Sequence, residues 1–276
     1  MNGSTPSRPR HPNTENAPHK VQIRELPAAQ GLRWIRDGWR LFRRQPFALA
    51  ALSAIYMLLV LFPATVPLLG PALAGIIAPF ASFGMMEACR DADRGQTPTP
   101  LAFGVALRAD PPRGEMIRLG FIHAAILVVV GLALAVAGLD ATMQILPPAE
   151  GSDVPSVQVD VPLLLLQFLV FLPLEMAMWF APVFVGWHRM PAPKAMFFSF
   201  FACWSNRWPL LLYAGATVLA CAGTGSLVLS LLAALVTSQE LLSLLSAPLV
   251  LVGSGFVLTT LYPIYRSIVV GPGETA

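Results

Sequence analysis

Two ionisable side chains interrupt long apolar stretches of the sequence and are the residues best placed to do chemistry. Glu175 lies within the apolar stretch 171–179, and His123 lies within the apolar stretch 119–138. A carboxylate at the centre of a membrane costs a few kcal/mol or more, so we expect Glu175 to face the protein interior, a partner or water. Glu175 could be a proton or cation site. The alternative, which we favour, is a structural glutamate that hydrogen-bonds a neighbouring helix.

His123 could titrate near neutral pH and pass protons towards Glu175. At about 1.5 Å of rise per residue, however, the two side chains are expected to differ in membrane depth by about 10 Å, which argues against direct pairing. We therefore favour a histidine that bonds a backbone carbonyl or touches the membrane interface. Glu175 and His123 together form the candidate intramembrane polar site.

Other kinds of chemistry find little support in the sequence. No nucleophile elbow, HExxH, P-loop or dinucleotide fingerprint occurs. The three cysteines form no CxxC pair, and the four histidines share no ligand spacing. We therefore expect no enzymatic activity, no metal and no cofactor. We also expect no nucleic-acid partner, because the positions of the basic residues account for the formal charge of +3.

The composition requires a membrane. Hydrophobic residues make up 55% of the 276 residues and charged residues only 12%, against about 25% charged residues in ordinary soluble domains. A spanning helix needs roughly 20 apolar residues. The runs that qualify are 47–69, 71–89, 117–138, 161–187, 209–236 and 241–264. Four or five spans are the alternative, because Pro63, Pro67, Pro71 and Pro79 crowd the first two runs.

The basic residues divide the connections between these runs into two classes. All 18 Lys and Arg residues lie before the first run, from the end of the second run into the start of the third, between the fourth and fifth, or at the end of the sixth. The long connection 139–160 is acidic instead. The positive-inside rule then places both termini in the cytoplasm and requires an even number of spans.

The segment 28–45 has the pattern of a basic amphipathic helix that lies in the headgroup plane. On a helical wheel, Leu32, Ile35, Trp39 and Phe42 share one sector, the arginines share the neighbouring sector, and Trp34 and Leu41 lie together on a further side. Such a helix favours anionic lipids. The candidate headgroup contacts are Arg33, Arg36, Trp39, Arg40, Arg43 and Arg44.

The remaining organisation follows from these assignments. Residues 1–27 are polar and predict a disordered cytoplasmic tail. Residues 46–270 form the six-span domain, and 271–276 form a second cytoplasmic tail. A Pro-x-Pro-x-Ala pattern recurs at 98–102 and 191–195, each time opening a short segment before a span. The chain therefore predicts three units, each a cytoplasmic surface helix followed by a two-span hairpin.

Two patches resemble a known family. The first is the run 32–46, Leu-Arg-Trp-Ile-Arg-Asp-Gly-Trp-Arg-Leu-Phe-Arg-Arg-Gln-Pro. The second comprises Phe180, Ala181, Pro182, Pro191, Ala195, Ser199, Ala202, Asn206, Pro209 and Tyr213. Both are similar to an uncharacterised family of six-span bacterial inner-membrane proteins found in Burkholderia-type genomes. The resemblance implies a bacterial inner membrane and no particular activity.

We therefore predict an all-α polytopic membrane helical bundle of about six transmembrane helices in three hairpins, with cytoplasmic interfacial amphipathic helices. The favoured function is a non-enzymatic, lipid-engaging or membrane-assembly factor that contacts membrane lipids, preferably anionic ones. The alternative is a small-molecule or proton-coupled transporter that uses Glu175. A transporter should have a water-accessible polar cavity that reaches Glu175, whereas a scaffold should have a filled core.

Overall fold

The computed structural model describes residues 21–67, 69–108, 113–139, 143–146, 156–236 and 238–270. Residues 1–20 of the predicted tail 1–27, and the whole predicted tail 271–276, lie outside these residues. The described chain is almost entirely helical, which confirms the predicted all-α class. Its helices are α1 (Gln30–Phe42), α2 (Pro46–Ala64), α3 (Gly70–Asp93), the 3-10 helix η2 (Pro100–Leu107), α4 (Arg113–Val136), α5 (Val161–Met178), α6 (Ala181–His188), α7 (Ala192–Ser205), α8 (Arg207–Leu235) and α9 (Gln239–Ile268).

Six helical stretches in the described chain are long and apolar enough to cross a membrane, as the sequence predicted. They are Pro46–Ala64, Gly70–Asp93, Arg113–Val136, Val161–His188, Arg207–Leu235 and Leu244–Ile268. The fourth stretch consists of α5 and α6, which are separated by a break at Trp179 and Phe180. A shorter helix, α1, η2 or α7, precedes each successive pair of spans.

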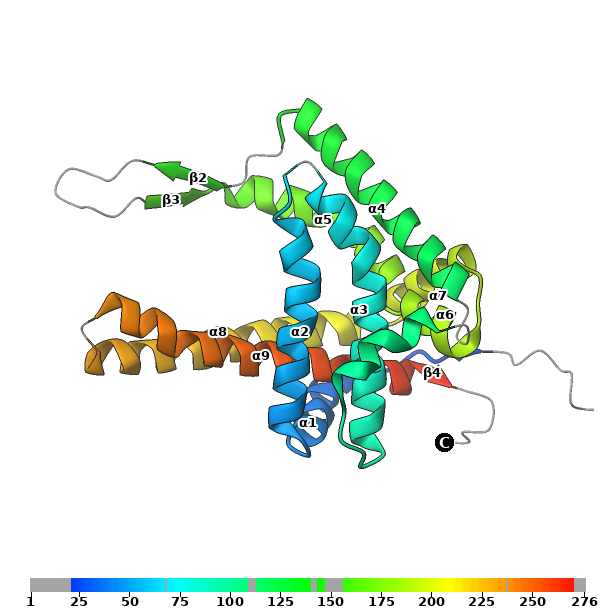
Figure 1. Cartoon of the computed structure of the whole chain (residues 1–276), viewed down its shortest axis with the longest axis horizontal. Coiled ribbons are helices and arrows are strands. Elements are labelled where there is room, and N and C mark those ends of the chain that lie inside the picture. The colour runs from blue at the N-terminus through cyan, green and yellow to red at the C-terminus, as the bar shows by residue number, and fades with distance from the viewer. Residues whose placement is uncertain are drawn as a thin grey trace, which may run out of the picture.

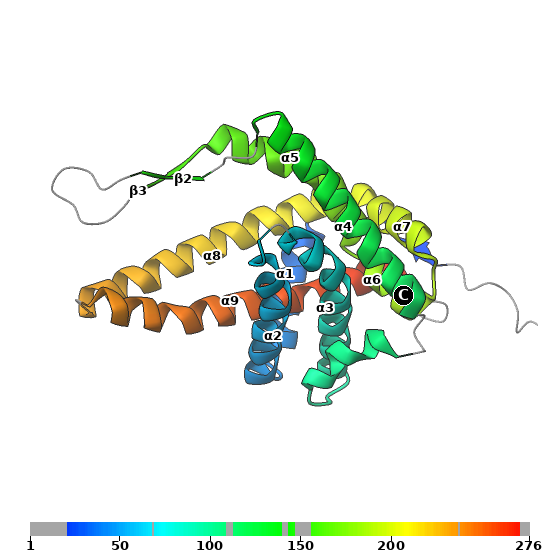
Figure 2. The ribbon, with the colours of Figure 1, turned by 45° about the horizontal axis from the view of Figure 1, so that its top comes forward.

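The three pairs of spans do not pack alike. In the first pair, α2 and α3 lie side by side along much of their length. In the second pair, α4 packs mainly on α3, and α5 packs mainly on α7. In the third pair, α8 and α9 form a long hairpin that runs crosswise to α2 and α3 and projects away from them (Figures 1 and 2).

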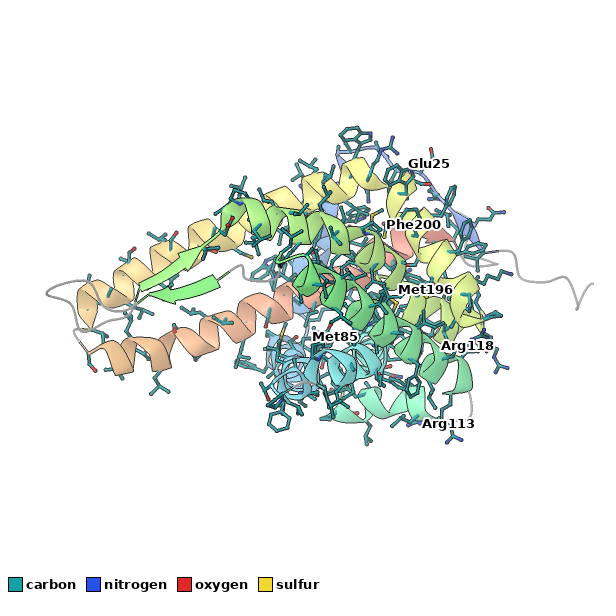
Figure 3. All side chains as sticks on the ribbon, turned by 90° about the horizontal axis from the view of Figure 1, so that it is seen from above. Glu25, Met85, Arg113, Arg118, Met196 and Phe200 are labelled. Atoms are coloured by element: carbon teal, nitrogen blue, oxygen red, sulfur yellow. The ribbon has the colours of Figure 1, made fainter. Side chains whose placement is uncertain are left out.

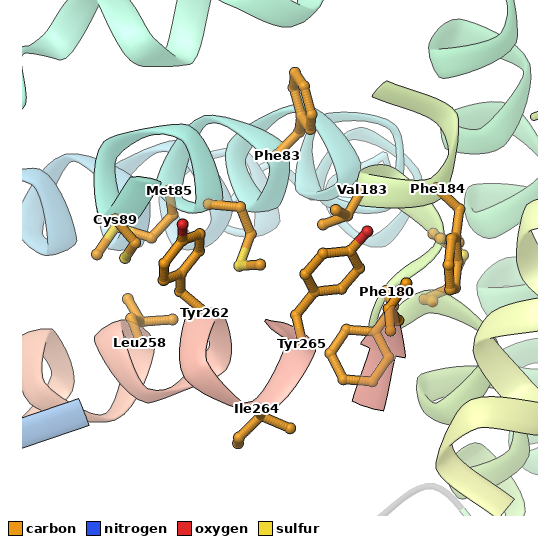
Figure 4. Close-up of a cluster of buried hydrophobic side chains, with 14 of the residues drawn as sticks. Phe83, Met85, Cys89, Phe180, Val183, Phe184, Leu258, Tyr262, Ile264 and Tyr265 are labelled. Carbon is orange, nitrogen blue, oxygen red and sulfur yellow. The ribbon is translucent and has the colours of Figure 1, made fainter. Parts of the chain in front are cut away.

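A cluster of buried hydrophobic side chains lies where α3, α6 and α9 meet (Figure 4). Phe83 and Met85 of α3, Val183 and Phe184 of α6, and Tyr265 of α9 are buried there. The Phe83 ring occupies the space where a side chain on Gly186 would lie, so α3 and α6 can approach closely only because residue 186 is glycine. His188 Nε2 and the Tyr265 hydroxyl, 2.5 Å apart, link the end of α6 to α9.

The two ends of the described chain meet. Strand β1 (Gln22–Ile23) pairs antiparallel with β4 (Val269–Val270), and the Arg24 amide donates to the Ile268 carbonyl. This pairing corrects the predicted disordered tail, which extended to residue 27. Backbone groups of 22–24 find partners at residues 268–270, at the other end of the described chain, which no local pattern in the polar tail could reveal.

The connection between α4 and α5 contains a second antiparallel pair, β2 (Met143–Leu146) with β3 (Ser156–Val159), where the sequence predicted only an acidic loop. Basic residues lie at the end of the molecule opposite the tip of the α8–α9 hairpin. Figure 3 shows Arg113 and Arg118 there, near the start of α4.

Candidate functional site

A cavity of about 220 Å³ lies where five of the spans converge, and it contains both residues of the predicted polar site. The polar side chains on its wall are Tyr56, Ser82, His123, Glu175 and Trp179. The remaining wall is formed by Ala78, Pro79, Met178, Pro182 and Leu261. The cavity is open on one side, because Glu175 and Trp179 are exposed. We call it the Glu175 cavity.

A proline on α3 exposes the backbone carbonyl that determines which ring nitrogen of neutral His123 carries the proton. Pro79 has no backbone N–H, so the Gly75 carbonyl one turn earlier loses its helical partner. His123 Nδ1 lies 3.0 Å from that carbonyl oxygen. A carbonyl can only accept, so Nδ1 carries the proton and Nε2 of the neutral ring is an acceptor. His123 is only 7% exposed, and its Nε2 has no hydrogen-bond partner among the residues that the structure describes. The predicted carbonyl bond is present, and a second, unused acceptor remains.

The break between α5 and α6 positions the other polar groups. Glu175 lies one turn before the break, and Trp179 lies in it. Tyr56 of α2 and Ser82 of α3 place two hydroxyl-bearing side chains on the same cavity wall as Glu175. A carboxylate, a histidine acceptor, two hydroxyls and an indole therefore surround one small space.

Glu175 and His123 line the same cavity, although the sequence argued against direct pairing. No hydrogen bond or ion pair joins their side chains among the described residues, so the cavity brings them together without a direct contact. The helix that carries His123 begins at Arg113, and the chain is interrupted between α5 and α6 just after Glu175. Sequence reasoning also missed Tyr56 and Ser82. The signal for Tyr56 was its position as a hydroxyl-bearing residue within an uncharged run.

Helix α1 carries the second candidate site, which we call the α1 surface. The face packed on the protein contains Gly31, Trp34, Gly38, Leu41 and Phe42. A side chain at Gly38 would collide with Thr260 of α9. The Trp34 indole N–H donates to the Ser267 hydroxyl at 2.7 Å. The sequence placed Trp34 and Leu41 on a separate side, and that side is the one buried against the bundle.

The outward part of α1 is divided into two strips. Leu32 and Trp39, which are 52% and 47% exposed, form an apolar strip. The five arginines predicted to bind headgroups, Arg33, Arg36, Arg40, Arg43 and Arg44, form the neighbouring basic strip and are all exposed. The outward part of the helix therefore presents an apolar and a basic strip side by side, and the Trp39 ring also packs edge-on against Phe256 of α9.

Two of these arginines already have carboxylate partners. Arg40 pairs with Asp37 at 3.2 Å, and Arg44 pairs with Asp93 at the end of α3 at 3.1 Å. Arg266 of α9 also reaches Asp93, at 2.7 Å. These charges line an open cleft of about 370 Å³. Within the described part of the chain, Arg33, Arg36 and Arg43 make no ion pair, and they are the arginines best placed to meet headgroup phosphates.

Some further chemistry can be assessed directly. Among the residues that the structure describes, no group of three His, Cys, Asp or Glu side chains could hold a metal ion. Burial raises the pKa of the Cys203 thiol in α7 to about 12. That thiol is therefore protonated at neutral pH and is a poor nucleophile.

The comparisons with known proteins agree with this architecture. The chain is similar to a probable inner membrane protein of Burkholderia thailandensis, with 29% identity over 199 residues that cover 70% of this chain and 74% of the relative. This confirms the resemblance found in the sequence and supports a multi-pass protein of the inner membrane. No family model matches the chain, and no solved structure matches it.

Proposed function

We propose that this protein is a non-enzymatic, lipid-engaging protein of the inner membrane, and that its α1 surface binds anionic headgroups. One observation carries the proposal: the outward side of α1 has an apolar strip directly beside a basic strip, while its third side is fixed to the bundle. Leu32 and Trp39 would enter the region between headgroups and acyl chains. Arg33, Arg36 and Arg43 would meet the phosphates.

The proposed orientation has both termini in the cytoplasm. The pairing of β1 with β4 supports an even number of spans, because it holds the two ends of the domain together. The all-or-none distribution of Lys and Arg supports the cytoplasmic side. Alkaline phosphatase fused after Asp153 should be active, and fusions after Gly95 or Met190 should be inactive. Activity at either of the last two positions would contradict this orientation.

The headgroup proposal is tested on the full chain purified in mild detergent. Native mass spectrometry would measure how much phosphatidylglycerol remains bound relative to phosphatidylethanolamine. The test variant changes Arg33, Arg36 and Arg43 together to Gln. Each arginine near an anionic surface is worth about 1 kcal/mol, so the triple variant should lose tenfold or more of the retained phosphatidylglycerol.

A matched control removes three exposed arginines from another part of the chain. Arg108, Arg113 and Arg118 are also exposed, so their change to Gln lowers the net charge equally. Retention of phosphatidylglycerol should then stay within about twofold of the unchanged protein, since each distant charge is largely screened. An equal loss in both triple variants would show general charge attraction and would refute a role for α1.

Transport that uses Glu175 is the second candidate function. The observation in its favour is the Glu175 cavity, which places polar groups from several spans around one space. Transporters bind their substrates near the bilayer midplane in such places. Uptake of a radiolabelled solute into proteoliposomes, lost on Glu175→Gln at normal protein level, would support this candidate.

A further inference from the structure

The Glu175 cavity offers acceptors to a ligand and lacks positive charge. The Glu175 carboxylate and His123 Nε2 both accept hydrogen bonds, and neither meets a donor in the described part of the chain. No Lys or Arg is among the described residues on the cavity wall, and none of them forms an ion pair with Glu175. A charge at this depth is stable only if it is paired or solvated.

His123 is the independent sign that the cavity is built for a ligand. Its side chain lines the cavity and is more than nine-tenths buried, yet one ring nitrogen has no hydrogen-bond partner among the described residues. An orphaned buried acceptor costs about 1–3 kcal/mol, and natural proteins rarely leave one unless something else fills the role. In the neutral ring, the bond to the Gly75 carbonyl holds the proton on Nδ1 and so leaves Nε2 as an acceptor.

We propose that the Glu175 cavity binds a small protonated primary amine. The ammonium group would donate to the Glu175 carboxylate and to His123 Nε2, which satisfies both acceptors and pairs the charge. The Trp179 indole would face the cation, and its ring attracts positive charge. Met178 and Leu261 would contact the carbon chain. The volume of about 220 Å³ lies below the usual range for drug-sized ligands, so the amine has only a few heavy atoms.

Other ligand classes fit less well. An anion would be repelled by Glu175. A metal ion usually needs at least three protein ligands, and no such group comes together in the described residues. The inference concerns the site that the second candidate function would use. Binding can be measured without transport, so a failure of one can be told from a failure of the other.

The test uses the full chain in detergent and isothermal titration with ethylammonium chloride. Ethanol and sodium acetate serve as neutral and anionic probes of similar size, at equal ionic strength. Saturable binding of ethylammonium alone is expected. Glu175→Gln preserves shape and removes the charge, so it should weaken binding tenfold or more. Glu25→Gln makes the same change at an exposed position outside the cavity and should leave binding unchanged.

A second variant separates ligand binding from structural support. His123→Asn leaves an amide that can donate to the Gly75 carbonyl but removes the Nε2 acceptor. It should keep the thermal midpoint within a few degrees and weaken ethylammonium binding several-fold. Equal binding by the unchanged protein and Glu175→Gln would overturn the proposal. So would the absence of saturable ethylammonium binding, which would mean a cavity filled by water beside a protonated Glu175.

Discussion

Helices α3 and α8 are both long apolar spans, but they have opposite surroundings. Half of the most apolar stretch of α3 is buried within the protein, and none of the corresponding stretch of α8 is. Their glycines show the difference at close range. A side chain at Gly75 or Gly84 of α3 would collide with a neighbouring element, whereas one at Gly215 or Gly223 of α8 would meet open space.

This contrast shows that the hydropathy of a span indicates an apolar environment but does not distinguish lipid from the protein interior. Lipid tails are as apolar as leucine, so a span facing lipid and a span facing protein have the same overall composition. A small residue in a span marks a close helix contact only where the backbone of a second helix lies directly beside it. Gly75 has such a neighbour in Ala124 of α4, while Gly223 has none among the described residues.

The largest expected effect breaks the α3 contact. In Gly75→Leu, the new Cβ would lie 2.8 Å from the Ala124 Cα atom, so α3 and α4 must separate. Overpacking against backbone costs about 3 kcal/mol, and the protein should unfold at a clearly lower temperature. Gly223→Leu is the matched control in α8 and should keep the thermal midpoint within a few degrees. Equal losses in a detergent unfolding assay would remove the distinction between the two helices.

An intermediate effect concerns buried and exposed polar side chains. Asn206 is fully buried, accepts from the Leu26 amide and donates to the Arg24 and Ala202 carbonyls, each at 3.0 Å. Asn206→Ala should cost about 2 kcal/mol, because backbone groups lose their partners. Trypsin should then cleave at Arg24 at least tenfold faster. Ser226→Ala removes an exposed hydroxyl from α8, and its cleavage rate should not change.

The smallest expected effect concerns ion pairs at the end of α3. Asp93→Asn removes pairs with Arg44 and Arg266, whose side chains are about half exposed. Such pairs are worth at most about 1 kcal/mol each, despite the number of partners. The loss of stability should shrink further in 1 M salt, where screening is strong. A larger loss than that of Asn206→Ala would mean that charge outweighs burial at this end of the protein.

The sequence predicted where the helices of this fold lie better than it predicted which helix faces pack against one another. Six spans and the helix at 28–45 follow from apolar length, proline positions and arginine spacing, all of which are local. The choice of face was harder. Trp34 and Trp39 are both aromatic residues on α1, yet one is fully buried and the other is half exposed. Only the positions of Pro209, Thr260 and Ser267, far along the chain, decide which one is covered.

The sequence identified Glu175 and His123 because ionisable groups are rare in apolar runs. That both line one cavity follows from the packing of helices far apart in the sequence, which spacing along the chain does not give. Tyr56 and Ser82 join the site only through the packing of α2 on α3.

The docking of α1 also has a consequence for the order in which the protein is made. Its contacts at Gly31 and Gly38 are with Pro209 and Thr260, which leave the ribosome much later. During synthesis, Trp34 and Leu41 would therefore stay uncovered until the later helices are made, and they would contact lipid in the meantime. Once the final span is inserted, this face of α1 can pack on the protein, and β1 can pair with β4. Completion of the chain, rather than insertion of its first hairpin, would be the event that frees the outer strips of α1 for their mature role.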